Sequence, residues 1–414
     1  MKKCDGYPLI KCGNLLTSLK TGPFGSALNT EHWTTNGTAV LTIGSLGEQS
    51  IIEDELLYIS DSYAEKLNPY KVNEGDIVFS RVADIGRAQL IDKKQDGWVI
   101  SSNLMKMTVN KELIRPAFLY IAIKDSPVVT GQFKSHSNGN GRLLVNSSIV
   151  KSIKIPTPEL AVQDKLINII SSWDNAIKKT ESLIAAKEKQ FEWLKSQLLL
   201  NNPKSAQWNT STLGEFIVEK KEKSSTPDLY PCLTSSRRGI FLQEDYFSKQ
   251  VASKDNSGYK IISRGDFTFR SMSDDGIFVF NKQTIIDNGL ISPAYGVFSP
   301  KENMDSDFLY YFLNSPAFRR ALSGEVQGGT RTALKLNALK SLDVEIPDLS
   351  EQKDISSKLN NAKQEIDLLK GILDKYRSQK RGLMQKLLTG KWRVSSTLTA
   401  TEDMQREHTK EEVA

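Results

Sequence analysis

The chain of 414 residues is longer than one compact core usually holds, so we expect two or more domains. Hydrophobic residues make up 39% and charged residues 25%, no apolar run is long enough to span a bilayer, and the N-terminus lacks the apolar core of a secretory signal. The net charge of +6 permits nucleic-acid binding but does not require it. Three cysteines without metal spacing predict a cytoplasmic protein, and three scattered histidines disfavour a bound metal. No membrane contact and no cofactor are expected.

The first part of the chain, residues 1–155, predicts a mixed α/β globular domain. The run DIVFS at 76–80 is rich in β-branched and aromatic residues and follows a glycine, which is typical of a short strand. The later run PAFLYIAIKDS predicts a short buried helix. Residues 202–346 repeat this composition, with GIFVF at 276–280 as a strand and SDFLYYFL as a helix.

The two halves of the chain repeat each other at an offset of about 190 residues. GDIVFSR at 75–81 returns as GDFTFRS at 265–271, and VNSSIVKSIKIP at 145–156 returns as LNALKSLDVEIP at 336–347. A period of this length is too large for a solenoid repeat. It indicates a duplicated unit that consists of one globular domain and one helix.

A long helix is expected after each Ile-Pro sequence, because proline is favourable at a helix entrance and is then absent from both stretches. Apolar residues recur there in alternating steps of four and three, which is the heptad seam of a coiled coil, with polar interruptions at Thr180, Lys187 and Lys380. Two unrelated amphipathic helices, each packed on its own domain, are the alternative. The apolar seam residues are Leu166, Ile170, Trp173, Ile177, Ile184, Phe191, Leu194, Leu198, Ile355, Leu359, Ile366, Leu369, Leu373, Tyr376, Leu383 and Leu387.

The order of these segments predicts their arrangement. The second domain starts where the first helix ends and passes the chain to the second helix near that point, so the helices should be antiparallel. About 40 residues at about 1.5 Å each form a rod of roughly 60 Å. The expected fold class is therefore α/β (mixed α+β): two copies of a globular domain joined by two long antiparallel coiled-coil helices with pseudo-two-fold symmetry.

Enzyme motifs are not found in the sequence. There is no G-x-x-x-x-G-K-S/T loop and no G-x-G-x-x-G after a strand. LNPY at 67–70 and NSPAF at 314–318 lack the double proline of an adenine methyltransferase motif, and we interpret both as turns. The acidic pair Asp274 and Asp275 has no nearby E-x-K and is expected to be a solvated turn. We therefore predict no catalytic residues.

The entrances IKIPTPELAVQDKL and VEIPDLSEQKDI, the two heptad helices and the exit KRGLMQKLLTGKWR resemble those of the specificity subunit of type I restriction-modification enzymes. The openings GPFGSAL and WNTSTLGEF are similar to the starts of its two target-recognition domains, although GPFGSAL has no clear counterpart in the second half. The resemblance covers nearly all of residues 8–393. It implies a non-catalytic subunit that reads a bipartite double-stranded DNA site and assembles with two methyltransferase subunits and two restriction-translocase subunits.

The domain organisation expected from the repeat and the resemblance has five parts. A first target-recognition domain at 1–155 is followed by a spacer helix at 156–201. A second target-recognition domain at 202–346 is followed by a second spacer helix at 347–390, and the polar tail at 391–414 has no assigned role. The spacer would set the gap between the half-sites and dock the methyltransferase subunits.

Polar loops that carry Arg, Lys, Asn or Gln are the candidates for DNA contact, because these side chains read base edges and bind phosphates. The candidate residues are Lys20, Arg81, Arg87, Lys134, Asn138, Asn140, Arg142, Arg237, Arg238, Arg270 and Arg331. The loops that end in Arg142 and Arg331 recur at the repeat offset, which favours them. Any single arginine could instead be a solvated surface charge or an ion-pair partner.

Two other functions are compatible with the same sequence. One is a two-headed coiled-coil adaptor that binds proteins and has no DNA specificity. The other is a stand-alone DNA-modifying enzyme with a divergent active site, which the missing cofactor motifs disfavour. Methylation of a split DNA sequence that requires both this chain and a methyltransferase subunit would exclude both.

Overall fold

The computed structural model describes residues 6–48, 50–82, 87–135, 145–200, 202, 207–247, 255–325 and 332–394. The chain divides into two compact units. Unit 1 comprises Met1–Lys179 and Leu373–Ala414, and unit 2 comprises Thr180–Ile372. The division passes through both long helices, so each unit holds one globular head and one end of the helix pair. No helix in the described ranges is long and apolar enough to cross a membrane.

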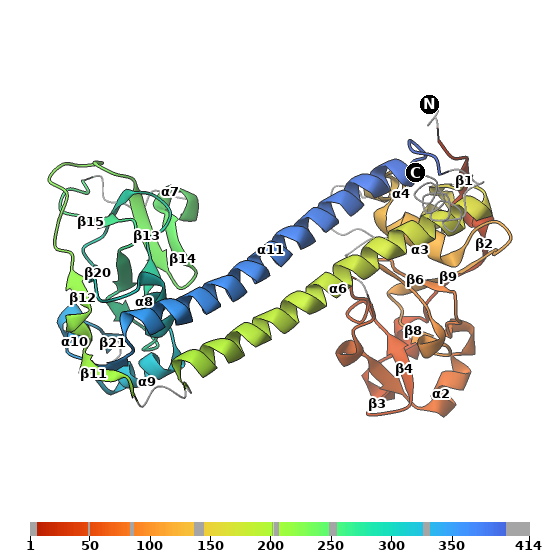
Figure 1. Cartoon of the computed structure of the whole chain (residues 1–414). Helices are drawn as coiled ribbons and strands as arrows, with labels where there is room; N and C mark the ends of the chain where they lie inside the picture. The colour runs from red at the N-terminus through yellow and green to blue at the C-terminus, as the bar shows by residue number, and fades with distance from the viewer. Residues whose placement is uncertain are drawn as a thin grey trace, which may run out of the picture. The chain divides into compact units, whose positions relative to one another are not determined.

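The head of unit 1 is built on two four-stranded sheets (Figure 1). The first is antiparallel, in the order β2 (Leu16–Thr21), β9 (Leu104–Val109), β6 (Ile77–Ser80) and β7 (Ala88–Leu90). The second has the order β3 (Trp33–Thr34), β5 (Leu57–Ile59), β4 (Thr38–Leu41) and β8 (Val99–Ile100), and its β4 and β8 are parallel. Helices α3 (Pro116–Asp125) and α4 (Pro127–Ser135) share one hydrophobic core with the first sheet.

The head of unit 2 repeats the antiparallel sheet of unit 1, whereas its second sheet has a different strand order. Its antiparallel sheet has the order β12 (Ile217–Glu219), β20 (Tyr295–Pro300), β16 (Phe267–Arg270) and β18 (Asn281–Lys282). Its other sheet has the order β14 (Gly239–Leu242), β13 (Cys232–Ser236), β19 (Asn288–Ile291) and β15 (Lys260–Ser263), again with one parallel pair, β13 and β19. Helices α8 (Ser306–Leu313) and α9 (Pro316–Glu325) occupy the place of α3 and α4 in the sequence repeat.

A buried aspartate at the start of each central strand makes the same hydrogen bonds in both heads. Asp76 accepts from the backbone N–H of Asn73 at 2.9 Å and from the Thr108 hydroxyl at 2.6 Å. Asp266 accepts from the backbone N–H of Ser263 at 2.8 Å and from the Ser299 hydroxyl. Each carboxylate thus closes the turn before the strand and ties it to a neighbouring strand, which explains the repeated Gly-Asp dipeptide.

A two-stranded ribbon leads from each head into its helix. In unit 1, β1 (Leu9–Lys11) pairs with β10 (Lys154–Pro156), and in unit 2, β11 (Asn209–Thr212) pairs with β22 (Asp343–Ile346). The long helices α6 (Leu160–Leu199) and α11 (Leu349–Leu387) begin shortly after these ribbons. The first Ile-Pro sequence therefore ends its ribbon, and in unit 2 the ribbon ends at Ile346, one residue before the proline.

The glutamine of each entrance motif fastens the head to the first turn of the helix. Gln163 is fully buried; its Oε1 accepts from the N–H of Arg115 at 2.8 Å, and its Nε2 donates to the carbonyls of Leu113 at 3.2 Å and Pro158 at 2.8 Å. Gln352, 1% exposed, makes the equivalent bonds in unit 2. The three distances there are 2.8 Å to the N–H of Asp305, 3.3 Å to the carbonyl of Asn303 and 2.9 Å to the carbonyl of Pro347.

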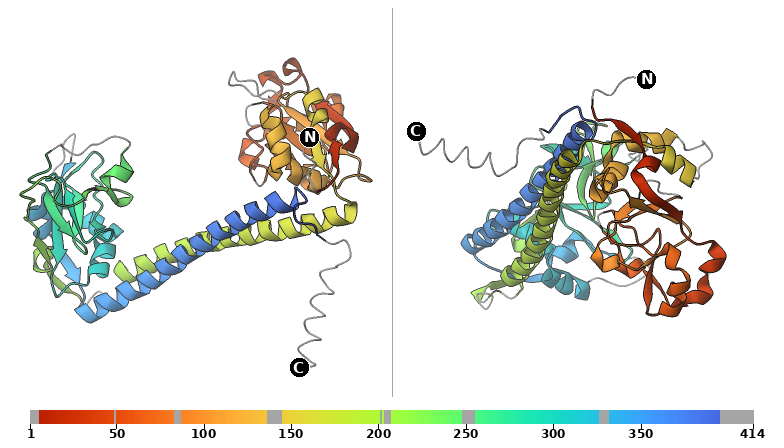
Figure 2. Two further views of the ribbon diagram at one scale, coloured as in Figure 1. Left: turned by 90° about the horizontal axis from the view of Figure 1, so that it is seen from above. Right: turned by 90° about the vertical axis from the view of Figure 1, so that its right-hand side faces the viewer.

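The helices α6 and α11 pair antiparallel within each unit, and they also lie side by side in both views of Figure 2. In unit 1 the rings of Trp173 and Tyr376 meet edge to face at 5.8 Å. In unit 2 the Nζ of Lys187 lies 2.8 Å from Glu365, and Asn202, just beyond α6, donates to Glu351 at 3.3 Å. All the apolar seam residues predicted from the sequence are buried or half-buried.

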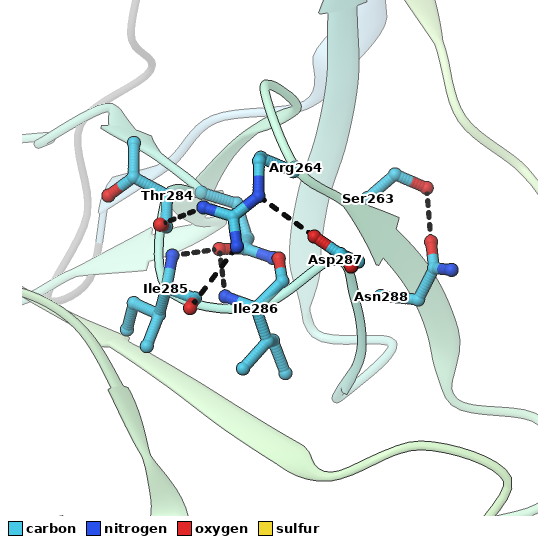
Figure 3. Close-up of polar contacts among 8 residues, drawn as sticks. Ser263, Arg264, Thr284, Ile285, Ile286, Asp287 and Asn288 are labelled. Atoms are coloured by element: carbon cyan, nitrogen blue, oxygen red, sulfur yellow. Dashed lines mark hydrogen bonds and ion pairs between the residues drawn. The ribbon is translucent and has the colours of Figure 1, made fainter.

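One exposed arginine of unit 2 has a purely structural set of partners (Figure 3). Arg264 lies in the turn between β15 and β16. Its Nε donates to Asp287 at 3.0 Å, its Nη1 to the carbonyl of Thr284, and its Nη2 to the carbonyl of Ile285 at 3.4 Å. Because all three nitrogens are used within the head, this guanidinium fixes a loop.

Candidate nucleic-acid interface

In unit 1, the predicted DNA-contacting loops meet at one end of the sheet β2-β9-β6-β7. The N–H of Ser80 donates to the carbonyl of Arg87 at 2.8 Å, so Arg81 and Arg87 flank the same strand ends. Gly22, which opens the loop after Lys20, donates to the carbonyl of Leu104 at 2.9 Å, at the same end of the neighbouring strand. Residues from three separate parts of the chain are therefore brought to one edge.

The third loop of unit 1 returns to the same place. Val145, the first described residue after residues 136–144, donates its N–H to the carbonyl of Arg81 at 2.8 Å. The predicted contacts Asn138, Asn140 and Arg142 lie outside the described residues.

The predicted basic residues of unit 1 have different surroundings. Lys20 is exposed on β2, and Lys134 is exposed near the end of α4. Arg87 donates from Nη1 to the carbonyl of Ile43 at 3.2 Å, so it also supports the second sheet. The Nε of Arg81 is buried and makes no hydrogen bond to the described residues. Lys20 and Lys134 are thus exposed to solvent, whereas Arg81 and Arg87 are partly buried in the head.

An aromatic residue that the sequence analysis did not select lies in the loop that opens at Gly22. Phe24 is 86% exposed, the highest value among the large hydrophobic residues of the described chain. Gly22 itself approaches the backbone closely, because a Cβ there would lie 2.0 Å from the carbonyl oxygen of Ser101. The GPFGSAL sequence therefore holds a phenylalanine in solvent at the edge where the basic loops meet.

In unit 2, two of the predicted loops line one pocket of about 460 Å³. Arg237, in the turn between β13 and β14, forms one side, and Arg270, at the end of β16, forms another. Tyr246 and Phe247, at the end of α7 (Gln243–Tyr246), add an aromatic wall. Charged donors and flat apolar rings therefore face the same space.

The floor of this pocket is held by a polar network. Asn281 donates from Nδ2 to the Ser235 hydroxyl at 2.8 Å and to the carbonyl of Ser236 at 2.7 Å. The Tyr295 hydroxyl donates to the carbonyl of Ser235 at 3.3 Å. These bonds fix the last residues of β13 and therefore the position of the arginine turn that follows.

Both arginines of the turn between β13 and β14, Arg237 and Arg238, have partners within the head. Arg237 donates from Nη2 to Asp275 at 2.5 Å. The guanidinium of Arg238 lies over the rings of Tyr246 at 5.3 Å and Phe241 at 5.9 Å, which are distances typical of cation–π contacts. The neighbouring Arg238 also lowers the pKa of the Tyr246 hydroxyl by hydrogen bonding to it.

The acidic pair at 274–275 was expected to be a solvated turn, and for Asp275 that prediction is incomplete. Its Oδ1 accepts from Ser273 at 2.9 Å and from the N–H of Ile277 at 3.1 Å in addition to Arg237. These donors, Arg237 first, lower the pKa of Asp275 well below its usual range. The repeat could not reveal this contact, because it joins two loops that are 38 residues apart.

The last predicted loop of unit 2 ends beside the pocket. β21 (Thr332–Ala333) pairs with β17 (Met272–Ser273), and Leu334 donates its N–H to the carbonyl of Ser271 at 2.9 Å. This bond is the counterpart of the one from Val145 to Arg81. The predicted contact Arg331 lies outside the described residues. Among the described residues of the chain, no group of three His, Cys, Asp or Glu could hold a metal ion.

Comparison with known proteins identifies the family. The family model for the type I restriction modification DNA specificity domain matches the chain twice, over residues 15–188 and 205–375. The chain therefore belongs to this family of DNA sequence-specificity subunits. The resemblance and the predicted fold class of two mixed α/β domains with two long helices are confirmed, and the adaptor alternative has no support.

Two curated relatives and two solved structures cover most of the chain. The specificity subunit of the type I restriction enzyme MjaVIII from Methanocaldococcus jannaschii is 25% identical over 375 residues, 82% of this chain and 85% of the relative. The putative MjaX specificity subunit of the same organism is 24% identical over 388 residues, 87% of this chain and 88% of the relative. The crystal structure of the HsdS subunit from Thermoanaerobacter tengcongensis has a TM-score of 0.51 at 16% identity, over 93% of this chain and 96% of that one. The S subunit from M. genitalium has a TM-score of 0.53 at 15% identity, over 94% and 98% of the two chains.

Proposed function

We propose that this protein reads a split double-stranded DNA sequence, one half with each head, and carries no catalytic site of its own. The observation that supports this most directly is the convergence of the predicted loops on one sheet end in both heads, through the equivalent bonds of Val145 and Leu334. A reader of DNA needs several donor-bearing loops on one surface, because phosphate contacts set the register and base contacts set the sequence.

The two heads present different chemistry, so we propose that they read different half-sites. The edge in unit 1 offers the exposed Lys20, Lys134 and Phe24. The edge in unit 2 offers a pocket lined by Arg237 and Arg270, and Arg238 lies in the same turn as Arg237. Lysine is a point charge suited to phosphates, whereas arginine presents a planar fork that matches the guanine edge.

We assign the parts of the chain accordingly. The heads at 1–155 and 202–346 are target-recognition domains, the helical stretches at 156–201 and 347–390 are spacers, and the tail at 391–414 has no assigned role. We propose that the spacers set the gap between the half-sites and bind two methyltransferase subunits. Two restriction-translocase subunits would then join this complex. The helices leave Leu183, Trp193, Leu368 and Ile372 exposed, so these side chains are available to a partner there.

The test is methylation that depends on this chain. Cells without other DNA methylation would express a methyltransferase subunit of the same system alone or together with this protein, and their methylated bases would be mapped by sequencing. We expect methylated adenines in a sequence with two defined halves and a fixed gap, and only when both chains are present. Methylation at the same sites without this chain, or none with it, would contradict the proposal.

A further inference from the structure

The arginine turn of unit 2 has no equivalent in unit 1, so it can distinguish the half-sites. In the repeat, CLTSSRRG at 232–239 aligns with VLTIGSLG at 40–47, which places Arg237 opposite Ser45 and Arg238 opposite Leu46. Ser45 and Leu46 are both fully buried in unit 1. In unit 2 both arginines are exposed, and the side chain of Arg237 is 60% accessible.

Asp275, the partner of Arg237, is held in place by hydrogen bonds within its own loop. Asp275 Oδ1 accepts from the Ser273 hydroxyl and the Ile277 N–H, and Ser273, 8% exposed, also donates to the carbonyl of Ile277 at 3.0 Å. The carboxylate is therefore oriented by its own loop. It accepts a hydrogen bond from Nη2 of Arg237 and so fixes the orientation of the guanidinium.

The guanidinium of Arg237 keeps free donors, unlike that of Arg264. Among the described residues, Arg237 makes its only hydrogen bond through Nη2, to Asp275. Its Nε, its Nη1 and the second N–H of Nη2 remain for a ligand, and a fork needs two neighbouring donors of this set. Arg264 has a similarly exposed side chain, yet all three of its nitrogens donate to a neighbouring loop of the same head. An arginine that is oriented by one hydrogen bond and keeps its other N–H donors can bind a ligand outside the head.

The net charge of the Arg237–Asp275 pair indicates whether the ligand is a phosphate or a base edge. Arg237 and Asp275 together carry no net charge, and a carboxylate beside a guanidinium weakens its attraction for phosphate. The directional N–H donors are retained, and the acceptors that match an arginine fork in the major groove are O6 and N7 of guanine. A braced arginine also loses less side-chain entropy on binding than a free one.

From this geometry we infer that Arg237 reads a guanine in the half-site of the second head and that Asp275 is the residue that positions it. The inference rests on the proposed function. Arg238, which lies over the rings of Tyr246 and Phe241, and Arg270, which also lines the pocket, are left for phosphates. The pocket thus separates base reading from backbone binding.

The experiment is selection of bound duplexes from a randomised DNA library by the full-length protein, followed by sequencing. The variants are Arg237→Gln, Arg237→Lys and Asp275→Asn, and the matched control is Arg319→Gln. Arg319 is an exposed arginine of the same unit, on α9, and does not line the pocket. Its loss removes the same charge elsewhere. Circular dichroism and the melting temperature establish that each variant is folded.

We expect the wild type to prefer guanine at one position of one half-site. Arg237→Gln should lose that preference by about tenfold to hundredfold, as for a lost bidentate contact. Arg237→Lys should not restore it, because lysine lacks the fork. Asp275→Asn should relax the same position while binding to unrelated DNA is unchanged or stronger, since a negative charge is removed. In a further variant, Arg270→Gln, the salt dependence of binding should change more than in Arg237→Gln.

The outcomes separate this inference from the proposed function. If the wild type selects a split sequence and the Arg237 and Asp275 variants select the same one, the inference is wrong and the function stands. If Arg237→Gln relaxes the position but Asp275→Asn does not, the positioning role is wrong. If the wild type selects no sequence at all, the proposed function fails first.

Discussion

The two heads share the antiparallel sheet, and they differ in the connection that follows the first strand of the parallel pair. Both have an antiparallel sheet with a buried aspartate and a second sheet with one parallel pair. In unit 1 the chain between β4 and β5 runs from residue 42 to 56 and folds back into the core through Leu46. In unit 2 a short turn between β13 and β14 places two arginines in solvent. Recognition chemistry can therefore change where the framework does not.

The cores show a second difference that leaves the register intact. Ile77 faces Met107 across β6 and β9, and Phe267 faces Phe298 across the corresponding strands of unit 2. All four side chains are fully buried. The same strand pairing thus accommodates either aliphatic or aromatic side chains in the core.

Packing compensates for the larger rings elsewhere in the same sheet. The ring of Phe269 lies over Gly296, where a Cβ would come within 2.3 Å of a ring carbon, whereas its counterpart Phe79 faces Met105. A glycine opposite one aromatic residue makes room for the cluster of rings around Phe298. Each core is therefore adjusted as a set, as dense packing requires.

Substitution of the entrance glutamines tests whether the two frameworks are equivalent and has the largest expected effect. Gln163→Ala and Gln352→Ala each leave one N–H and two carbonyls without their side-chain partner. We expect each to lower the free energy of unfolding of its own unit by about 2–4 kcal/mol. Hydrogen exchange measured peptide by peptide would localise each loss.

The control for this comparison is Gln364→Ala, an exposed glutamine on the same helix as Gln352. It should change stability by less than about 0.5 kcal/mol. A loss in one unit only would show that the two fastenings, although alike in geometry, do not carry equal weight.

Much of the framework could be predicted from the sequence, because it depends on local signals that occur twice. Proline at the helix entrances, heptad spacing and the Gly-Asp dipeptide each have a direct physical meaning, and repetition separates them from chance. The long helices that include Leu166 and Ile355 followed from these signals alone.

The contents of the candidate site could be predicted only in part. Arg237 and Arg270 were selected by residue type, but their meeting in one pocket depends on the pairing of β13 with β19 and of β16 with β20. Asp275 was interpreted as solvated because a sequence shows neither its loop hydrogen bonds nor its distant arginine. Phe24 was overlooked because a phenylalanine usually indicates a core position. Contacts that recur in both halves could be inferred, and contacts present in one half could not.

A smaller effect is expected at a position where the heads differ in charge. Asp125 of unit 1 aligns with Asn314 of unit 2 through the Ser-Pro that follows each. Burial raises the pKa of Asp125, and the nearby Lys380 and Lys124 only partly oppose this. Because the folded-state pKa lies above the unfolded value, stability is lost as the pH rises from the unfolded to the folded pKa.

Asp125→Asn gives unit 1 the residue of unit 2 and should remove this dependence. At neutral pH we expect the variant to be more stable than the wild type by about 1 kcal/mol or less, and the difference should disappear below about pH 4, where the unfolded chain also binds the proton. Thermal unfolding at several pH values measures this, with Asp54→Asn at an exposed position as the control. A gain that persists at low pH would assign the effect to packing instead of charge.

The smallest expected effect concerns the polar positions of the helix seam. Lys187 pairs with Glu365 in unit 2 at 2.8 Å, and Lys380 pairs with Asp174 in unit 1 at 2.5 Å. Both lysines are partly covered while their carboxylate partners are about half exposed, so water screens each pair. Double-mutant cycles with alanine should give a coupling of about 0–1 kcal/mol for each pair, falling with added salt. A coupling that is clearly larger in one unit would mean that its lysine fixes the register of the helices, which is the best-attested use of a polar residue in such a seam.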